Sequence, residues 1–183
     1  MLVPGQKLPE FNFRAVVSRE KGKEFANITN KTYPGKWLVL YTYPKDFTFI
    51  CPTEIVDFDK KVKAFAERDA VVIGGSCDNE HSHLAWRNQH TDLQGINHPL
   101  AFFKPQWAAE AGILHPTVGV TLRTTIIVDP EGTVRWAVAN DLDVGRNTDE
   151  TLRVLDALQT GELCACNWKK GEDTLTQKMK KAG

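Results

Sequence analysis

A run of aromatic, β-branched and other apolar residues from Trp37 to Tyr43, ended by Pro44, constrains the fold of this chain more than any other feature. Such a run predicts a β-strand that is buried on both faces, and the proline marks its end. The segment from Thr53 to Arg68 has apolar residues at helical spacing, which predicts an amphipathic helix. A second apolar run, Ala70 to Gly74, predicts the next buried strand.

The same alternation of short strands and helices continues along the chain, and it predicts an α/β protein with an open sheet. The first strands are apolar throughout, so we expect them to lie centrally with helices on both faces. The other expected elements are strands at 11–17, 124–128 and 133–139, the last two antiparallel, and helices at 80–90, at 106–111 and from Thr148 as N-cap onward. We expect residues 1–160 to form one domain, followed by a polar tail at 161–183.

The charge balance and the apolar runs exclude several classes of protein. Lys and Arg number 23 and Asp and Glu number 23, so the basic excess typical of a duplex-binding domain is missing. No apolar run approaches the roughly 20 residues that a membrane helix needs. The first residues carry no basic and apolar leader pattern typical of a signal peptide. We therefore expect a cytoplasmic protein that binds neither nucleic acid nor a membrane.

Cys51 is the first candidate for a reactive residue. It follows the carboxyl end of the strand at 37–43, where open α/β sheets tend to bind their ligands. It falls in the first turn of the next helix, either as the cap with Pro52 as first helical residue, or three residues after a capping Thr48. In both cases backbone N–H groups and the positive end of the helix dipole stabilise a thiolate. The alternative interpretation is a buried structural cysteine.

The other three cysteines call for different interpretations. Cys164 and Cys166, in the polar tail, are closer in sequence than the paired ligands of zinc sites, and the five histidines supply no obvious partner pair. We therefore expect no metal site. A resolving thiol that closes a disulfide with an oxidised cysteine fits them better. Cys77 ends the second buried strand, and we interpret it as a packing residue.

Several motifs are missing from the sequence. It has no Gly-rich phosphate loop and no dinucleotide fingerprint, so no nucleotide cofactor is expected. Cys51 has no second cysteine three residues away, which argues against a thioredoxin-like redox pair.

Residues 43–54, Tyr-Pro-Lys-Asp-Phe-Thr-Phe-Ile-Cys-Pro-Thr-Glu, resemble the active-site signature of peroxiredoxins. The resemblance is to the branch that contains alkyl hydroperoxide reductase and the typical two-cysteine enzymes. Segments 82–86, 123–130 and 144–150 resemble the helix after the second strand, the arginine-bearing strand and the loop after it in that family. The tail at 162–168 is similar to that of actinobacterial alkyl hydroperoxide reductase, which carries two cysteines there.

The resemblance implies a thioredoxin-like fold, with a central mixed sheet flanked by helices, and thiol-dependent reduction of hydrogen peroxide and organic hydroperoxides without a cofactor. Carried onto matching positions, Cys51 becomes the peroxidatic nucleophile, while Thr48 and Arg123 orient and polarise the peroxide. Pro44 shields the pocket. Cys164 becomes the resolving cysteine, which forms a disulfide with the sulfenic acid of the partner subunit.

Three residues receive secondary roles. Glu54 follows Cys51 by three positions, on the same helix face, and is expected to hold an arginine; a solvated surface position is the alternative. Arg146 is interpreted as a structural residue beside the site, and Cys166 as a thiol able to replace Cys164.

The resemblance also implies partners. It predicts a homodimer, commonly assembled into a ring in this family, and a disulfide reductant. The reductant is thioredoxin, a flavoprotein disulfide reductase, or the small helical reductase of the actinobacterial branch. Two other functions stay open from the sequence: a thiol–disulfide oxidoreductase acting on protein disulfides, and a redox sensor or ring-forming holdase chaperone.

Overall fold

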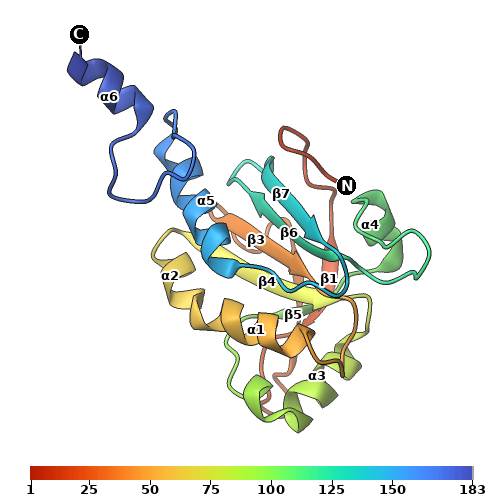
Figure 1. The fold of residues 1–183 in the computed structure, drawn as a ribbon. Coiled ribbons are helices and arrows are strands. Elements are labelled where there is room, and N and C mark those ends of the chain that lie inside the picture. Colours follow the sequence, from red (N-terminus) through yellow and green to blue (C-terminus); the bar gives the residue numbers. More distant parts are fainter. Residues whose placement is uncertain (183) are drawn as a thin grey trace. The chain divides into compact units, whose positions relative to one another are not determined.

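A seven-stranded mixed sheet with the strand order β2-β1-β5-β4-β3-β6-β7 forms the centre of the fold (Figure 1), in a computed structural model that describes residues 1–182. β3 pairs in parallel with β4 and antiparallel with β6, so the two apolar strands expected at the centre lie inside the sheet. The strands are β1 (Asn12–Val16), β2 (Phe25–Thr29), β3 (Trp37–Thr42), β4 (Ala70–Ser76), β5 (Leu100–Phe102), β6 (Arg123–Val128) and β7 (Val134–Asn140).

The chain forms two compact units, one of residues 1–146 and one that begins at Asn147. The first unit contains the sheet, and its helices are α1 (Cys51–Lys60), α2 (Val62–Ala66), α3 (Glu80–Gln89), the 3₁₀ turn η1 (Thr91–Leu93) and α4 (Pro105–Glu110). The second unit contains α5 (Thr148–Thr160) and α6 (Leu175–Ala182). The division comes before α5, whereas the sequence pattern predicted a tail that begins after this helix.

Helices cover both faces of the sheet. Alternate residues of β3 point to opposite sides, so this strand packs against a helix on each face. On one side Tyr41 stacks on Phe58 of α1, with ring centroids 4.0 Å apart. On the other side Leu38 and Leu40 join a core that includes Trp107 of α4. The prediction of an α/β protein with a central mixed sheet and flanking helices is confirmed.

Two features of the first unit differ from the sequence-based expectation. The helix expected at 53–68 is interrupted at Lys61, where ψ is 0° and α1 gives way to the short α2. Strands β2 and β5 were not predicted. β5 has only three residues and is held between β4 and β1, so neighbouring strands rather than local sequence define it.

The second unit corrects two further expectations. The N-cap of α5 is Asn147 rather than Thr148, since the Asn147 side chain accepts hydrogen bonds from the backbone N–H groups of Asp149 and Glu150. The polar tail contains an additional helix, α6, near its end. None of the described helices is both long and apolar enough to cross a membrane.

Candidate active site

Cys51 is the first residue of α1 and has no solvent-exposed surface. The cap residue is Ile50, which makes no side-chain capping bond, and Pro52 occupies the second helical position. Both predictions of the N-cap are therefore wrong: the cap lies one residue before Cys51 and two residues after Thr48. The placement of the sulfur in the first turn, beside unpaired backbone N–H groups, is as the sequence indicated.

Arg123 brings a permanent positive charge to the sulfur. It is the first residue of β6, and its NH1 atom lies 3.4 Å from Sγ of Cys51. The Nε atom donates to the carbonyl oxygen of Leu142 at 2.7 Å, which sets the orientation of the guanidinium group. Because arginine stays charged at any physiological pH, this contact places a fixed positive charge beside the sulfur of Cys51.

Glu54 joins Arg123 to a second arginine. Its Oε2 atom accepts from NH1 of Arg123 at 2.6 Å and from NH2 of Arg146 at 2.9 Å, and its Oε1 atom accepts from Nε of Arg146 at 2.8 Å. All three side chains are at most 4% exposed. The expectation that Glu54 holds an arginine is confirmed, and the carboxylate holds two of them. Because two guanidinium groups share one carboxylate, the cluster has an excess positive charge beside Cys51.

Arg146 is fixed by more than the ion pair. Its NH1 atom donates to the carbonyl oxygen of Thr124 at 2.8 Å, and its guanidinium carbon lies 5.2 Å from the ring centre of Tyr41 and 5.6 Å from that of Phe58. A guanidinium group over an aromatic face is attracted by the ring quadrupole. The arginine that was interpreted from the sequence as structural thus positions Glu54, and through it Arg123.

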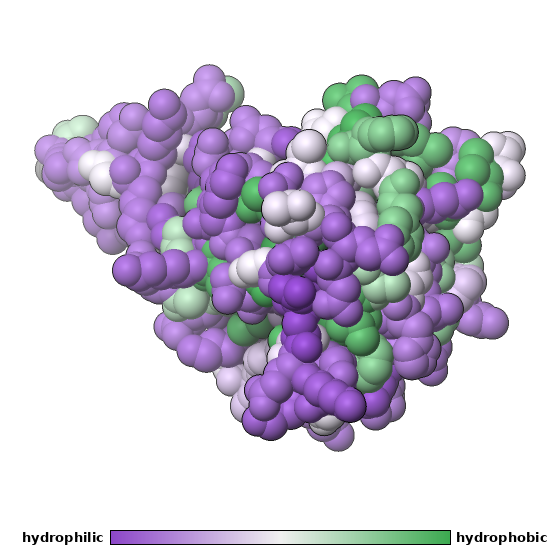
Figure 2. All heavy atoms as spheres, turned by 90° about the horizontal axis from the view of Figure 1, so that it is seen from below, coloured by the Kyte–Doolittle hydropathy of each residue, from purple (hydrophilic) through white to green (hydrophobic). Residues whose placement is uncertain are grey.

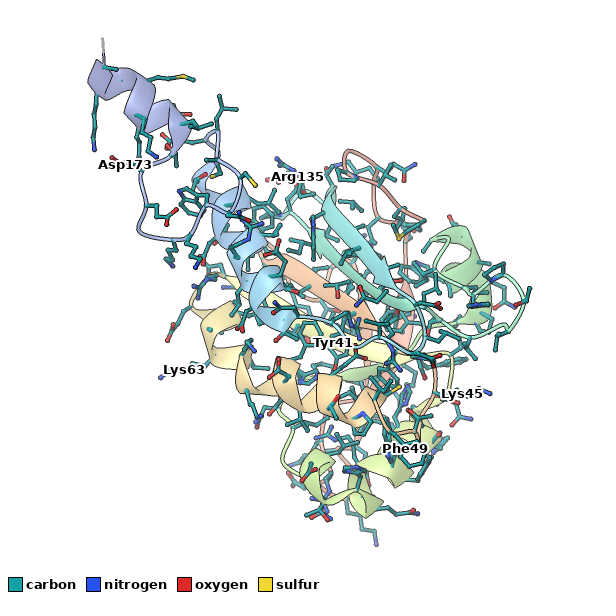
Figure 3. The ribbon with its side chains drawn as sticks, in the orientation of Figure 1. Tyr41, Lys45, Phe49, Lys63, Arg135 and Asp173 are labelled. Carbon is teal, nitrogen blue, oxygen red and sulfur yellow. The ribbon has the colours of Figure 1, made fainter. Side chains whose placement is uncertain are left out.

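Tyr41, which is labelled in Figure 3, belongs to a buried chain of hydrogen bonds that sequence reasoning missed. Its hydroxyl group lies 2.6 Å from Nε2 of His98, and Nδ1 of His98 lies 2.9 Å from Oδ1 of Asp59 in α1. Because a carboxylate only accepts, Nδ1 carries the proton and Nε2 accepts from the tyrosine. Burial raises the pKa of Tyr41 and lowers the pKa of His98. The available signal was a tyrosine in a buried strand, whose hydroxyl must find a partner.

The loop between β3 and α1, residues 43–50, is held in place by hydrogen bonds of Asp46, two of whose partners lie in α3. Asp46 accepts hydrogen bonds from the hydroxyl groups of Tyr43 at 3.0 Å and Ser82 at 2.7 Å, and its Oδ2 atom lies 2.8 Å from Nδ1 of His83. These residues also escaped sequence reasoning. Phe47 adopts a left-handed φ of 56°, which lets the loop turn sharply before the helix.

Pro44 and Thr48 lie in the same loop, and both are partly buried. The hydroxyl group of Thr48 donates to the carbonyl oxygen of Lys45 at 2.9 Å rather than to the sulfur. Figure 3 labels Lys45 and Phe49 at this turn, and the Phe49 side chain is 94% exposed. The structure therefore brings Cys51 together with Arg123, Glu54 and Arg146. The Thr48 hydroxyl group instead bonds within its own loop.

The remaining cysteines are free thiols in three different surroundings. Cys77 packs against the core, and burial raises the pKa of its thiol to about 11, which agrees with a packing role. Cys164, in the second unit, lies 3.5 Å from Oγ1 of Thr160 and donates to the carbonyl oxygen of Ala157 at 3.8 Å. Cys166 is exposed. Within residues 1–182 no three potential ligands gather into a metal site.

Comparisons with known proteins identify the family. Residues 4–137 match the family model described as the AhpC/TSA family. The chain is 46% identical to alkyl hydroperoxide reductase C of Mycolicibacterium smegmatis, over 96% of this chain and 94% of that protein. It is 45% identical to a putative peroxiredoxin in the rubredoxin operon of Clostridium pasteurianum, over 93% and 97% of the two chains.

Solved structures agree with these matches. The structure of AhpC from Mycobacterium bovis superposes with a TM-score of 0.84 at 43% identity, covering 92% of this chain and 99% of that one. A reduced 2-Cys peroxiredoxin from Plasmodium vivax gives a TM-score of 0.85 at 33% identity, covering 95% and 93% of the two chains. With a near full-length match in sequence and in fold, and a buried cysteine in contact with a buried arginine, the chain belongs to the AhpC/TSA family and is a peroxiredoxin.

Proposed function

We propose that this peroxiredoxin reduces hydrogen peroxide and organic hydroperoxides with Cys51 as the nucleophile. The observation that most supports this role is the contact of 3.4 Å between Sγ of Cys51 and NH1 of Arg123, within a buried cluster that has more positive than negative charge. A thiolate is the reactive form of cysteine, and it balances the excess charge of this cluster.

In the first step the thiolate attacks one peroxide oxygen. A bond forms between Sγ and that oxygen, the O–O bond breaks, and the leaving oxygen takes up a proton to depart as water or an alcohol. Negative charge grows on the leaving oxygen, and in this proposal the guanidinium group of Arg123 stabilises it; its contact of 3.4 Å with the sulfur supports this role. In this proposal the Thr48 hydroxyl rotates from the Lys45 carbonyl to the peroxide, and Pro44 shields the pocket.

In the second step the Cys51 sulfenic acid condenses with Cys164 of a second copy of the chain, which forms an intersubunit disulfide and releases water. Cys51 is fully buried, so its turn must open first. That turn is held by hydrogen bonds from the N–H groups of Thr53 and Glu54 to the Ile50 carbonyl oxygen, at 3.0 and 3.3 Å. Pro52 has no N–H to contribute, which makes the turn easier to open.

The cycle closes when a dithiol reductant reduces the disulfide. The reductant is thioredoxin, a flavoprotein disulfide reductase or a small helical alkyl hydroperoxide reductase partner, and the working form is a homodimer, assembled into a ring. We place the protein in the cytoplasm, where such reductants keep thiols reduced.

Peroxide consumption, measured with each purified reductant in turn, tests the activity, and non-reducing electrophoresis tests the disulfide. Peroxide-treated protein should migrate as a covalent dimer, and Cys164→Ser should weaken that band, with Cys166 replacing the lost thiol in part. The double Cys164→Ser and Cys166→Ser variant should react with peroxide once and then stop. Disulfides found only between Cys164 and Cys166 of one chain would contradict the intersubunit step.

A redox sensor or holdase is the alternative function. Reaction of Cys51 with peroxide no faster than that of a free thiol would favour it.

A further inference from the structure

The last helix, α6, is fastened to the segment that carries Cys164 and Cys166. The N–H group of Leu175, the first residue of α6, donates to the carbonyl oxygen of Leu163 at 2.8 Å. The N–H group of Leu163 donates to Oγ1 of Thr176 at 3.0 Å. Thr174, just before the helix, donates to Oε2 of Glu162 at 2.6 Å. Three hydrogen bonds thus place the start of α6 beside the residues that precede Cys164.

The exposed surface of α6 combines basic and apolar side chains. Lys178, Lys180 and Lys181 lie in this helix, which contains no acidic residue. Lys181 pairs with Asp173 at 2.7 Å, whereas Lys178 and Lys180 form no salt bridge within the described residues. Asp173 is labelled in the loop before α6 in Figure 3.

Apolar residues lie among these lysines. Leu175 and Met179, one helical turn apart, are 36% and 64% exposed, and Leu163 is 62% exposed. Figure 2 shows a largely hydrophilic surface that hydrophobic residues interrupt in places. Protein–protein interfaces commonly have apolar residues at their centre and polar or charged residues at their rim. We call Leu163, Leu175, Lys178, Met179 and Lys180 the α6 surface.

We propose that the α6 surface is the docking site for the disulfide reductant, and that this reductant presents acidic residues around its redox-active dithiol. The proposal rests on the proposed function, because it assumes that a disulfide at Cys164 must be reduced. Its basis is the attachment of a locally basic, partly apolar helix to the cysteine segment of a chain whose overall net charge is zero.

Charge and position both favour such a partner. Attraction between a basic patch and an acidic partner raises the association rate, and the effect weakens as salt screens the charges. A basic helix with an apolar face can also bind an anionic membrane. The three hydrogen bonds to residues 162 and 163 favour the redox partner, because they tie the start of this lysine-bearing helix to the residues that directly precede Cys164.

The test uses synthetic dithiol peptides that share one Cys-x-x-Cys core and carry either four glutamates or four lysines around it. The full-length protein is first oxidised with one equivalent of peroxide, and its reduction by each peptide is followed at low and high salt. Dithiothreitol, which is uncharged, reports the intrinsic reactivity of the disulfide. We expect the acidic peptide to react about tenfold faster than the basic one at low salt, and the two rates to converge at high salt.

Reversing the charge of two lysines of the α6 surface tests whether this surface causes the preference for the acidic peptide. Lys178→Glu with Lys180→Glu should abolish or invert the preference, while the matched pair Lys21→Glu with Lys31→Glu, at exposed sites of the first unit, should preserve it. Rates with dithiothreitol should be the same for both variants. Equal rates for the two peptides would overturn the docking proposal alone, whereas failure of the wild-type protein to form any disulfide with peroxide would overturn the proposed function.

Two further measurements distinguish other possible occupants of the α6 surface. Cosedimentation with phosphatidylglycerol vesicles, lost on charge reversal, together with equal peptide rates, would assign the α6 surface to a membrane. A change in sedimentation mass of the Lys178→Glu with Lys180→Glu variant would assign it to contacts between copies of the chain. Either result would overturn the proposal.

Discussion

Arg123 and Cys51, separated by 72 positions in the sequence, meet at 3.4 Å between NH1 and Sγ. The contact exists because β6 pairs antiparallel with β3, which brings the first residue of β6 to the end of β3 from which the active-site loop departs. A strand start and a helix start thus face each other across the site. Both contribute positive potential at the sulfur, one from a side chain and one from backbone N–H groups.

Arg123→Lys should lower the rate constant for peroxide reduction by about tenfold or more. Lysine keeps the charge but loses the planar fork, so it cannot hold Glu54, the Leu142 carbonyl and the sulfur together as Arg123 does. Stopped-flow measurement of sulfenic acid formation at Cys51 checks this. An unchanged rate constant would mean that Arg123 has no part in the chemistry.

Glu54→Gln should destabilise the fold by about 3 kcal/mol or more, because it leaves two buried guanidinium groups without their counter-ion. The free energy of unfolding from urea titration measures the loss. The matched control is Glu150→Gln, which breaks a more exposed pair with Arg153 and should cost less than about 1 kcal/mol. Equal losses for the two variants would contradict the interpretation of Glu54 as the centre of the cluster.

Cys51→Ser should abolish peroxide reduction, since a serine hydroxyl supplies essentially no anion at neutral pH. Cys77→Ser should keep most of the activity, because the raised pKa of Cys77, about 11, keeps that thiol protonated. Steady-state peroxide consumption with a fixed reductant compares the two variants. Substantial turnover by Cys51→Ser would exclude the proposed nucleophile.

His98→Gln should flatten the dependence of stability on pH. Burial lowers the pKa of His98 in the folded protein, so the unfolded chain takes up a proton first as the pH falls through about 6.5. The wild-type protein should therefore lose stability between about pH 7.5 and pH 5, as this site binds more protons when unfolded. Urea midpoints across that range measure the slope.

His81→Gln is the control for this prediction, because the His81 side chain is 77% exposed and lies outside the buried chain of hydrogen bonds. It should keep the wild-type slope. Identical slopes for the wild-type protein and His98→Gln would show that the Tyr41, His98 and Asp59 chain has no linkage to folding.

The amino-acid sequence by itself determined the elements with strong local signals. The apolar run at 37–43 could only be a buried strand, and the residues around Cys51 identified the family and placed the sulfur in a first helical turn. Glu54 was assigned to the same helix face from its spacing alone. Such inferences succeed because hydrophobic periodicity and helix-end electrostatics act over a few neighbouring residues.

Only the tertiary structure decided which distant groups meet. The sharing of Glu54 by Arg123 and Arg146 depends on three segments brought together by the sheet, and no local pattern predicts it. The same holds for the Tyr41 hydroxyl and His98, and for β5, whose three residues are a strand because β4 and β1 flank them. Buried polar groups take whichever partners the packing supplies, so the electrostatics of this site follow from the fold and not from sequence spacing.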